Sequence, residues 1–578
     1  MRKKHRKFKL DENKAYTVLF VLIIFAIFQY AIERIYVFFL YPDEFGYWSS
    51  AATILGWDWK EVASLGSYYS FGYSIWLLPI LKFITGAPGT YRGAILVNLL
   101  LMYLSFFLVT KIAERIIPKA EKKTHILLSE LIILFPSWIF HLQFTATECV
   151  LFFLFVAITY LMILFLEKPK LQWGVLLALV SGYGFMVHMR FVGVVVAFAA
   201  TIVLWGVLQS KNRKKLIVLG LALMAVCVLA FFLKNIITNV VYGAAGKEML
   251  NWNDFGGQLG KFAFILTPKG FLALCVNFSG KLLYMGASSM GAFYYWLLWC
   301  FHEVIKIFRS LKQEQEIKAE SFLAVFLFLA VFAEIGIASI YSVKNAELDW
   351  NVYGRYSEFV LPVVMIFGMG WLYKQKDKFS KAVFALCCHT IVSMVCLISF
   401  LDTSLQEVRG YMSVGLSLLL RQDEVIPPFY LLGAWCLGAV LIYLWAICLN
   451  MLEKNKGRSW VIALLIAGEI FLGLQASHKY IYPVNEYMGE ELALGEFLLE
   501  EMPEAEILYL REDRVQWIDM IQMQLRERSI DVVELEELPQ KAVEGTVLIV
   551  HRDGKLRDEA AKWYSKFNEY NIFCLYYN

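Results

Sequence analysis

Apolar stretches of about 20 residues recur along most of the chain, with short polar segments between them. A helix needs about 20 mostly apolar residues to cross the hydrocarbon core of a bilayer. The chain is therefore predicted to be an α-helical polytopic membrane protein, with its membrane domain over 16–476. The thirteen predicted spans are 16–38, 93–112, 124–141, 147–166, 172–188, 191–209, 215–238, 286–306, 320–342, 357–374, 382–400, 428–450 and 459–475.

The lysines and arginines between these stretches follow a regular alternation. Every second connection is basic, and so is the N-terminal segment MRKKHRKFKL. Because Lys and Arg in short loops mark the cytoplasmic side, residues 1–15 are predicted to be a cytoplasmic tail, and the C-terminus to lie outside. The apolar segment 71–85 is short for a span, and counting it as one would place the basic loops outside. We therefore expect an interfacial or re-entrant helix there, within a long outer loop, 40–92.

The composition changes at about residue 477 to that of a soluble domain. Short β-type runs alternate with charged helical stretches, which is typical of a small α/β domain. We predict an extracytoplasmic α/β domain over 477–578, without a glycine-rich phosphate loop or a nucleophile motif. The predicted strands are 507–510, 530–535, 546–550 and 571–577, and the helical stretches are 487–501, 515–528 and 556–567.

Composition excludes several classes of protein. Hydrophobic residues make up 59% of the 578 residues, and charged residues only 18%, against about 25% in soluble proteins. A cytosolic enzyme, a secreted disulfide scaffold and a disordered chain are excluded on this ground. The net charge of +4 is too small to imply a nucleic-acid partner. Most of the ten cysteines fall within apolar stretches, where a thiol packs as a small hydrophobic group.

Acidic and basic residues gather at the predicted outer ends of the spans, in four separate parts of the chain. Charge near the bilayer centre costs at least about 2.5–3.5 kcal/mol per residue, so such groups need an explanation. Their common level predicts a shared cavity on the outer side. The residues are Asp43 and Glu44 in YPDEFGYW, Glu148 in FTATECV, His188 and Arg190 in VHMRF, and Arg355 and Tyr356 in YGRYSEF.

Most of these residues also have a simpler explanation. The Asp43-Glu44 pair could be a solvated loop pair or a helix cap, and Glu148 could satisfy free N–H groups at a helix start. Arg190 and Arg355 could contact lipid headgroups. Aromatic residues crowd the loop 40–92, Tyr47 among them, and an interfacial belt explains most of these. They could equally stack on a sugar or border a groove for a lipid tail.

The order of the motifs resembles the GT-C superfamily of polytopic glycosyltransferases, which includes the protein O-mannosyltransferases and the lipid A aminoarabinose transferases. The resemblance covers roughly 15–475. One departure is Ser70-Phe71, where many members carry a Pro-Pro or His-Pro pair. The matching motifs are Pro42-Asp43-Glu44-x-x-Tyr47, Gly72-Tyr73, Thr147-Glu148, His188-x-Arg190 and Arg355-Tyr356 with Pro362 six residues after Tyr356.

The resemblance implies transfer of a sugar from a polyprenyl-phosphate donor to a lipid, cell-envelope glycan or protein acceptor, on the outer face of a plasma membrane. Asp43 would be the catalytic base, with Glu44 orienting a substrate. Glu148 would position groups around Asp43, or share a divalent metal ion (Mg, Mn or Zn) with it. A single carboxylate base predicts inversion at the anomeric carbon. The expected donor-binding residues are Arg190, Arg355, Tyr356, His188 and Tyr47.

Other functions remain open at this stage. A transporter or flippase of lipid-linked glycans would show internal repeats and charges at the midplane of the membrane, and neither is evident here. A lipid-linked glycan ligase or polymerase would use the same compartment and substrate class. A non-catalytic membrane protein would leave the acid–arginine grouping unexplained.

Overall fold

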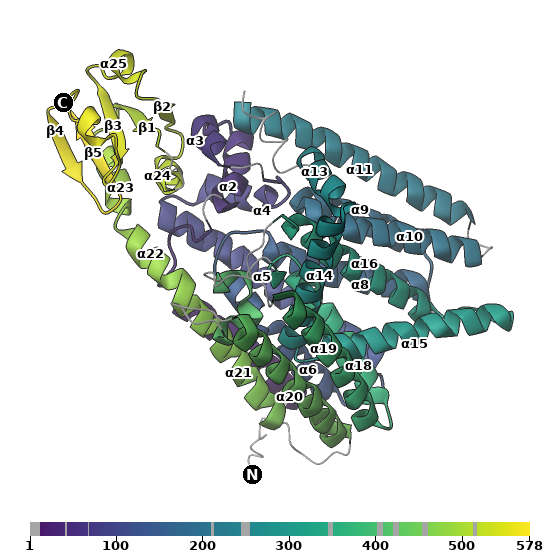
Figure 1. The fold of residues 1–578 in the computed structure, drawn as a ribbon. Coiled ribbons are helices and arrows are strands. Elements are labelled where there is room, and N and C mark those ends of the chain that lie inside the picture. The colour runs from purple at the N-terminus through teal and green to yellow at the C-terminus, as the bar shows by residue number, and fades with distance from the viewer. Residues whose placement is uncertain are drawn as a thin grey trace, which may run out of the picture.

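The computed structural model describes residues 12–40, 43–66, 69–209, 213–243, 255–344, 351–400, 409–419, 427–453, 460–512 and 517–578. Long helices pack side by side, and a small sheet lies beyond one end of this bundle (Figure 1). The long helices are α1 (Glu12–Ile32), α5 (Ala87–Ile116), α8 (Glu148–Glu167), α9 (Leu171–Val187), α10 (Val192–Leu208), α11 (Arg213–Tyr242), α14 (Pro268–Ser288), α15 (Ala292–Lys312), α16 (Ala319–Ser342), α18 (Leu361–Lys374), α19 (Lys378–Phe400), α20 (Pro427–Glu453) and α21 (Trp460–Ala476).

The predicted many-pass helical architecture is confirmed. Within the described residues, ten helices are long and apolar enough to cross a membrane. Each of the thirteen predicted spans has a helical counterpart, although the ends differ by several residues. The segment 124–141 is divided into α6 (Lys122–Ile133) and α7 (Pro136–His141). The break lies at Phe135, whose ψ of 137° is not helical, because a residue before proline disfavours the helical conformation.

Most of helix α14 falls between the predicted spans 215–238 and 286–306, so it was not predicted as a span. Its 21 residues nevertheless meet the length and apolarity expected of a membrane helix. The second half of α14 runs beside the end of α16, where Lys281 Nζ lies 3.3 Å from Ser342 Oγ. Tyr284 of α14 donates a hydrogen bond to Glu358, just before α18. Scattered polar residues along α14 make its apolar run shorter and harder to recognise.

Three short helices cover the bundle end that carries the acidic motif. They are α2 (Asp43–Ile54), α3 (Lys60–Leu65) and α4 (Ser74–Phe83). With ten residues, α4 is only about 15 Å long, too short to span, and it packs on α2 and α5. Its placement at the membrane interface stays a prediction. A fourth short helix at this end of the bundle is α13 (Phe255–Ile265).

The C-terminal α/β domain is present, as predicted. Its five strands are β1 (Glu506–Leu510), β2 (Ile530–Val533), β3 (Thr546–His551), β4 (Lys566–Glu569) and β5 (Phe573–Tyr577), in the order β2-β1-β3-β5-β4. The pairs β1–β2 and β1–β3 are parallel, whereas β3–β5 and β4–β5 are antiparallel. Every residue of β3 is buried, which explains its continuous apolar run.

Helices complete this domain and connect it to the bundle. A π-helical turn, Ser477–Ile481, joins α21 to α22 (Tyr482–Gly489) without a break. The remaining helices are α23 (Leu492–Glu500), α24 (Ile518–Leu525), α25 (Leu538–Lys541) and α26 (Arg557–Ala560). The predicted helix 556–567 is wrong beyond Ala560, because its last part forms the edge strand β4. Most of β4 is exposed, so it lacks the alternation of apolar and polar residues that identifies a strand.

Candidate functional site

The guanidinium of Arg355 joins carboxylates from two distant parts of the chain. Its Nη1 lies 2.9 Å from Asp43 Oδ2, and its Nε lies 2.8 Å from Glu148 Oε1. Asp43 is the first residue of α2, and Glu148 is the first residue of α8. Three of the four predicted motifs therefore meet in one cluster. Such charge-assisted pairing is strong when it is shielded from water, and Arg355 and Glu148 are both almost fully buried.

Arg190 extends this cluster on the Glu148 side. Its Nη2 lies 3.3 Å from Glu148 Oε1, and its guanidinium lies over the ring of Tyr356, 5.1 Å from the centroid. The His188 imidazole accepts a hydrogen bond from the Arg190 backbone N–H at 3.2 Å, which fixes the short turn between α9 and α10. Among the described residues, nothing bonds to Arg190 Nε or Nη1. A buried guanidinium thus keeps two donors for another anion.

Asp43 is the accessible carboxylate of the cluster. Its side chain is 29% exposed, whereas that of Glu148 is 2% exposed. Tyr69 donates its hydroxyl to Asp43 Oδ1 at 2.8 Å. Burial, followed by the charge of Asp43, raises the pKa of Tyr69 well above its ordinary value, so the phenol stays a donor. A substrate hydroxyl entering the site can therefore reach Asp43 but not Glu148.

Glu44, the next residue, has a different environment. Both of its oxygens accept hydrogen bonds inside the protein: one from the backbone N–H groups of Phe39 and Leu40 (2.7 and 2.8 Å), and the other from Tyr91 and Thr145 (2.7 Å to the Thr145 N–H). Burial raises the pKa of Glu44, and the hydrogen bonds that it accepts from these residues oppose that shift. Glu44 therefore holds together the chain around the start of α2 and is not directed at a substrate.

Tyr47 lies one helical turn after Asp43 and is buried. Its ring makes edge contacts with Tyr69 and Tyr73, with the ring centroids 5.6 Å apart in each pair. The backbone carbonyl of Tyr47 accepts a hydrogen bond from Ser74 Oγ at 2.7 Å. Tyr47 thus supports the wall around Asp43.

The segment carrying Arg355 is held by a second buried carboxylate, Glu358. Ser137 donates to Glu358 Oε1 at 2.7 Å, His141 Nε2 lies 3.0 Å from Oε2, and the hydroxyl of Tyr284 completes the set. The backbone N–H of Arg355 also donates to the Met412 carbonyl at 3.0 Å. These bonds fix the turn before α18 and thereby aim Arg355 at the two carboxylates.

Sequence reasoning missed several partners in this region. Tyr69 was one of many aromatic residues in the outer loop, and nothing in the sequence distinguished it. Thr145 and Tyr91, which bond Glu44, stand in separate segments with no motif around them. His141 and Glu358 are more than 200 residues apart, so their pairing is visible only in the fold.

The expected metal ligands do not fit a divalent ion in this arrangement. Asp43 and Glu148 are both bonded to Arg355, whose positive charge occupies the place between them. Within the described part of the chain, no group of three or more His, Cys, Asp or Glu residues could hold a metal ion.

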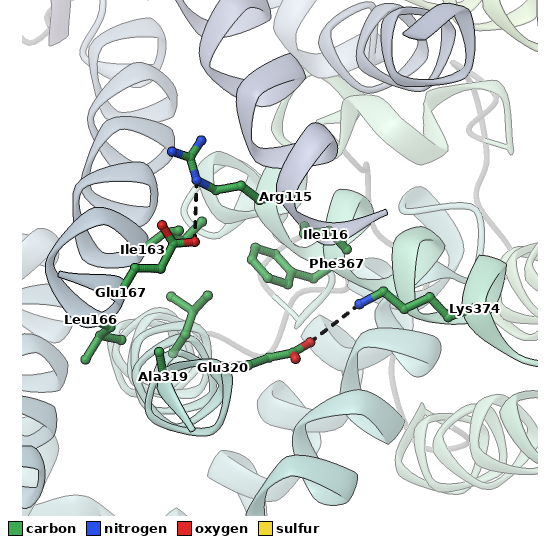
Figure 2. Close-up of a pocket in the computed structure, with 10 residues that line it drawn as sticks. Arg115, Ile116, Ile163, Leu166, Glu167, Ala319, Glu320, Phe367 and Lys374 are labelled. Carbon is green, nitrogen blue, oxygen red and sulfur yellow. Dashed lines mark ion pairs between the residues drawn. The ribbon is translucent and has the colours of Figure 1, made fainter. Parts of the chain in front are cut away.

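A cavity of about 150 Å³ lies elsewhere, at the far end of α8 (Figure 2). Glu148 begins this helix and Glu167 ends it, so the cavity lies about 30 Å from the charged cluster at about 1.5 Å per residue. Two ion pairs line it, Arg115–Glu167 at 3.5 Å and Lys374–Glu320 at 3.6 Å. All four side chains are about one-third to one-half exposed, which is typical of a solvated helix end.

Comparison with known proteins agrees with the geometry. A family model described as dolichyl-phosphate-mannose-protein mannosyltransferase matches residues 73–233, which include Glu148 and Arg190. The structure of ArnT from Cupriavidus metallidurans bound to undecaprenyl phosphate is 13% identical and covers 97% of this chain and 98% of ArnT, with a TM-score of 0.53. The protein has the GT-C glycosyltransferase fold.

The similarity of the GT-C fold extends from the membrane bundle into the C-terminal domain, because nearly all of both chains is covered. The apo structure of the same ArnT gives a TM-score of 0.52 at 12% identity, again covering 97% of this chain and 98% of that chain. Archaeoglobus fulgidus AglB in complex with an inhibitory peptide and a dolichol-phosphate is 13% identical, with a TM-score of 0.43 and coverage of 93% and 69%. No curated protein matches the sequence.

Proposed function

We propose that the protein is an integral membrane glycosyltransferase that moves a sugar from a polyprenyl-phosphate donor to an acceptor hydroxyl. The observation that carries the proposal is the bridge from the buried Arg355 to the partly exposed carboxylate Asp43 and the buried carboxylate Glu148. It combines a group that can take a proton with groups that can hold a phosphate. The occurrence of undecaprenyl phosphate in the ArnT structure supports the same class of donor.

In this proposal Arg190 and Arg355 bind the phosphate of the donor. A guanidinium suits a phosphate because two parallel N–H groups can reach two oxygens. Arg190 has the free donors for this, Nε and Nη1. Its position over the Tyr356 ring and the His188 bond to its backbone limit its movement. Glu148 orients both guanidiniums.

Asp43 acts as the general base. The acceptor oxygen attacks the anomeric carbon while its proton passes to Asp43, and the bond between that carbon and the phosphate oxygen breaks. The electron pair leaves on the polyprenyl phosphate, whose growing negative charge the two arginines stabilise. One displacement inverts the anomeric carbon. Glu44 and Tyr47 position α2, and no step requires a metal ion.

We place this reaction on the outer face of a plasma membrane, on the basis of the alternation of basic loops. The cluster lies at the predicted outer end of α8, whereas the basic residues Arg115 and Lys374 lie at its other end. A lipid-borne sugar must react at the level of the bilayer surface, and the alternation of basic loops predicts that Asp43 and Arg355 lie there. The acceptor is a lipid, an envelope glycan or a protein.

The test compares Asp43→Asn with Asp58→Asn in the full chain, purified into nanodiscs and supplied with polyprenyl-phosphate sugars and an envelope extract as acceptor. Asp58 belongs to the same outer segment, but it is 58% exposed and paired with Lys60. Asp43→Asn should lower the release of polyprenyl phosphate about 100- to 10,000-fold, whereas Asp58→Asn should not change it.

Mass spectrometry of envelope glycans, with and without the protein, identifies the sugar and the acceptor. A single added sugar supports the transferase, and an added oligosaccharide block would favour a ligase or polymerase. Equal release of polyprenyl phosphate by the wild-type chain and Asp43→Asn would exclude Asp43 as the base. Donor crossing the bilayer with its phosphate bond intact would favour a flippase instead.

A further inference from the structure

The C-terminal domain holds the end of α4 through one side chain. Arg526, which follows α24, donates from Nη1 to the Ile84 carbonyl at 2.6 Å and from Nη2 to the Leu81 carbonyl at 2.8 Å. Carbonyls in the last turn of a helix have no partner within the helix and must be satisfied from outside. A guanidinium more than 440 residues away in the chain therefore caps α4.

The same residue is also fixed to the loop that follows α2. The backbone carbonyl of Arg526 accepts a hydrogen bond from Trp59 Nε1 at 2.6 Å, and its guanidinium lies 4.9 Å from the centroid of the Trp57 ring. The Trp59 ring stacks on Phe45 of α2, with centroids 5.3 Å apart and planes within 6°. Phe45 stands two residues after Asp43.

A second contact joins the domain to α3. The backbone N–H of Val532 donates to Glu61 Oε2 at 2.5 Å. Val532 belongs to β2, an edge strand, and edge strands carry unpaired N–H groups that need a partner. The contact therefore uses a group that the sheet leaves available and supports the same orientation of the domain.

Helix α4 in turn supports the reacting end of α2. Its first residue, Ser74, donates to the Tyr47 carbonyl at 2.7 Å, and Tyr47 lies one helical turn after Asp43. The end of α4 is capped by Arg526. Both ends of this ten-residue helix are thus tied, one to the helix that carries Asp43 and the other to the C-terminal domain.

Arg526 adopts a backbone conformation that is rare for a residue with a side chain, with φ +56° and ψ −105°. Such conformations persist where the surrounding structure holds them in place, and they cluster at functional positions. Arg528, two residues later, has no such strain. It binds within its own domain, where it donates to the carbonyls of Leu498, Met502 and Ala505.

We propose that Arg526 is a positioning residue and that the C-terminal domain acts through it as a clamp on α4 and α2. The clamp keeps Asp43 at the distance from Arg355 that the reaction needs. The guanidinium holds the end of α4, and the backbone carbonyl holds Trp59 against Phe45. The effect on turnover rests on the proposed transferase function, whereas the effect on α4 does not.

The experiment measures hydrogen exchange of the full chain in nanodiscs, together with sugar transfer. Arg526→Gly is the informative variant because glycine adopts a positive φ without strain, so the domain keeps its fold while the guanidinium is lost. We expect exchange across 74–84 and 43–54 to rise at least threefold and exchange in β1 and β3 to stay unchanged. The turnover number should fall about tenfold, with the KM for the donor within twofold.

Two further variants make the result specific. Arg526→Lys keeps the charge but cannot reach both carbonyls with a planar fork, so α4 should exchange faster than in the wild-type chain. Arg528→Lys should raise exchange at the end of α23 and leave α4 unchanged. Unchanged exchange of α4 in Arg526→Gly would overturn the proposal. Faster exchange without any transferase activity in the wild-type chain would support the clamp and refute the proposed reaction.

Discussion

The two ends of α8 carry similar residues in different environments. At the first end, Glu148 pairs with Arg355 and Arg190, and all three side chains are at most 6% exposed. At the other end, Glu167 pairs with Arg115, and these side chains are 46% and 32% exposed. The distance at the second end is also longer, 3.5 Å against 2.8 Å.

The difference shows that burial, rather than the kind of residue, decides what an ion pair contributes. An exposed pair gains little because water and salt screen its charges. A buried pair costs much desolvation, and removing one partner leaves a charge without compensation. The protein retains this arrangement at one end of α8, where two donors of Arg190 stay available. A buried cluster with spare donors is suited to binding an anion.

The largest expected effect is a loss of stability when Glu148 is substituted, compared with the same substitution of Glu167 at the other end of α8. Glu148→Gln keeps an oxygen for both arginines but removes the charge that neutralises them, which should lower the free energy of unfolding by about 3–5 kcal/mol. Glu167→Gln should lower it by at most about 1 kcal/mol. Chemical unfolding of the purified chains in mixed micelles measures both.

Sugar transfer gives a second measure of the same pair of variants. Glu148→Gln should reduce it strongly, because Arg355 loses the partner that orients it, whereas Glu167→Gln should leave it unchanged. Equal effects at the two ends would mean that burial does not make the two ion pairs differ in function.

A smaller effect is expected from the arginines. Arg190→Ala should raise the KM for the donor about 10- to 100-fold, in line with about 1.5–3 kcal/mol for hydrogen bonds to a charged group. Arg115→Ala, which changes the same residue type at the other end of α8, should leave the KM unchanged. Steady-state kinetics with varied donor concentration decides the matter. A normal KM in Arg190→Ala would exclude Arg190 from the phosphate site.

Much of the fold was predictable because the bilayer imposes a strong and simple pattern. Apolar runs of about 20 residues identified the spans, and the period of the strands identified β1, β2, β3 and β5. Helix α14 was not predicted because polar residues such as Lys281 interrupt its apolar sequence. The partners of these residues, such as Ser342, lie on another helix. Strand β4 was not predicted because it is short and exposed.

The site was predictable as a set of residues but not as a set of bonds. We could group Asp43, Glu148, Arg190 and Arg355 because all four lie at the same predicted level of the membrane. The resemblance gave the base role to Asp43 and a substrate-orienting role to Glu44, whereas in the structure Asp43 is partly exposed at the site and Glu44 accepts hydrogen bonds within the protein. The difference between their environments depends on which distant segments of the chain pack against each residue, and no local sequence pattern predicts that.

The comparison can be extended to a third case, a buried carboxyl that pairs with no cation among the described residues. Asp519 of α24 supplies it in the C-terminal domain. Asp519 is 2% exposed, and no described residue bonds its Oδ2. Burial raises the pKa of Asp519 well above its ordinary value, so the folded domain binds this proton more tightly than the unfolded chain does.

The sign of the pH effect follows from that shift. Stability should be fully present below the ordinary pKa of an aspartate and should fall as pH rises towards the raised pKa, by at most about 1.4 kcal/mol per pH unit. Asp519→Asn cannot ionise, so it should lose less stability than the wild-type chain between pH 5.5 and pH 8. Chemical unfolding of the two chains at both pH values isolates this difference from all other titrating groups. If the two chains lost equal stability, Asp519 would have to be neutralised by a partner, as Glu148 is, and the contrast between paired and unpaired buried carboxyls would fail at this position.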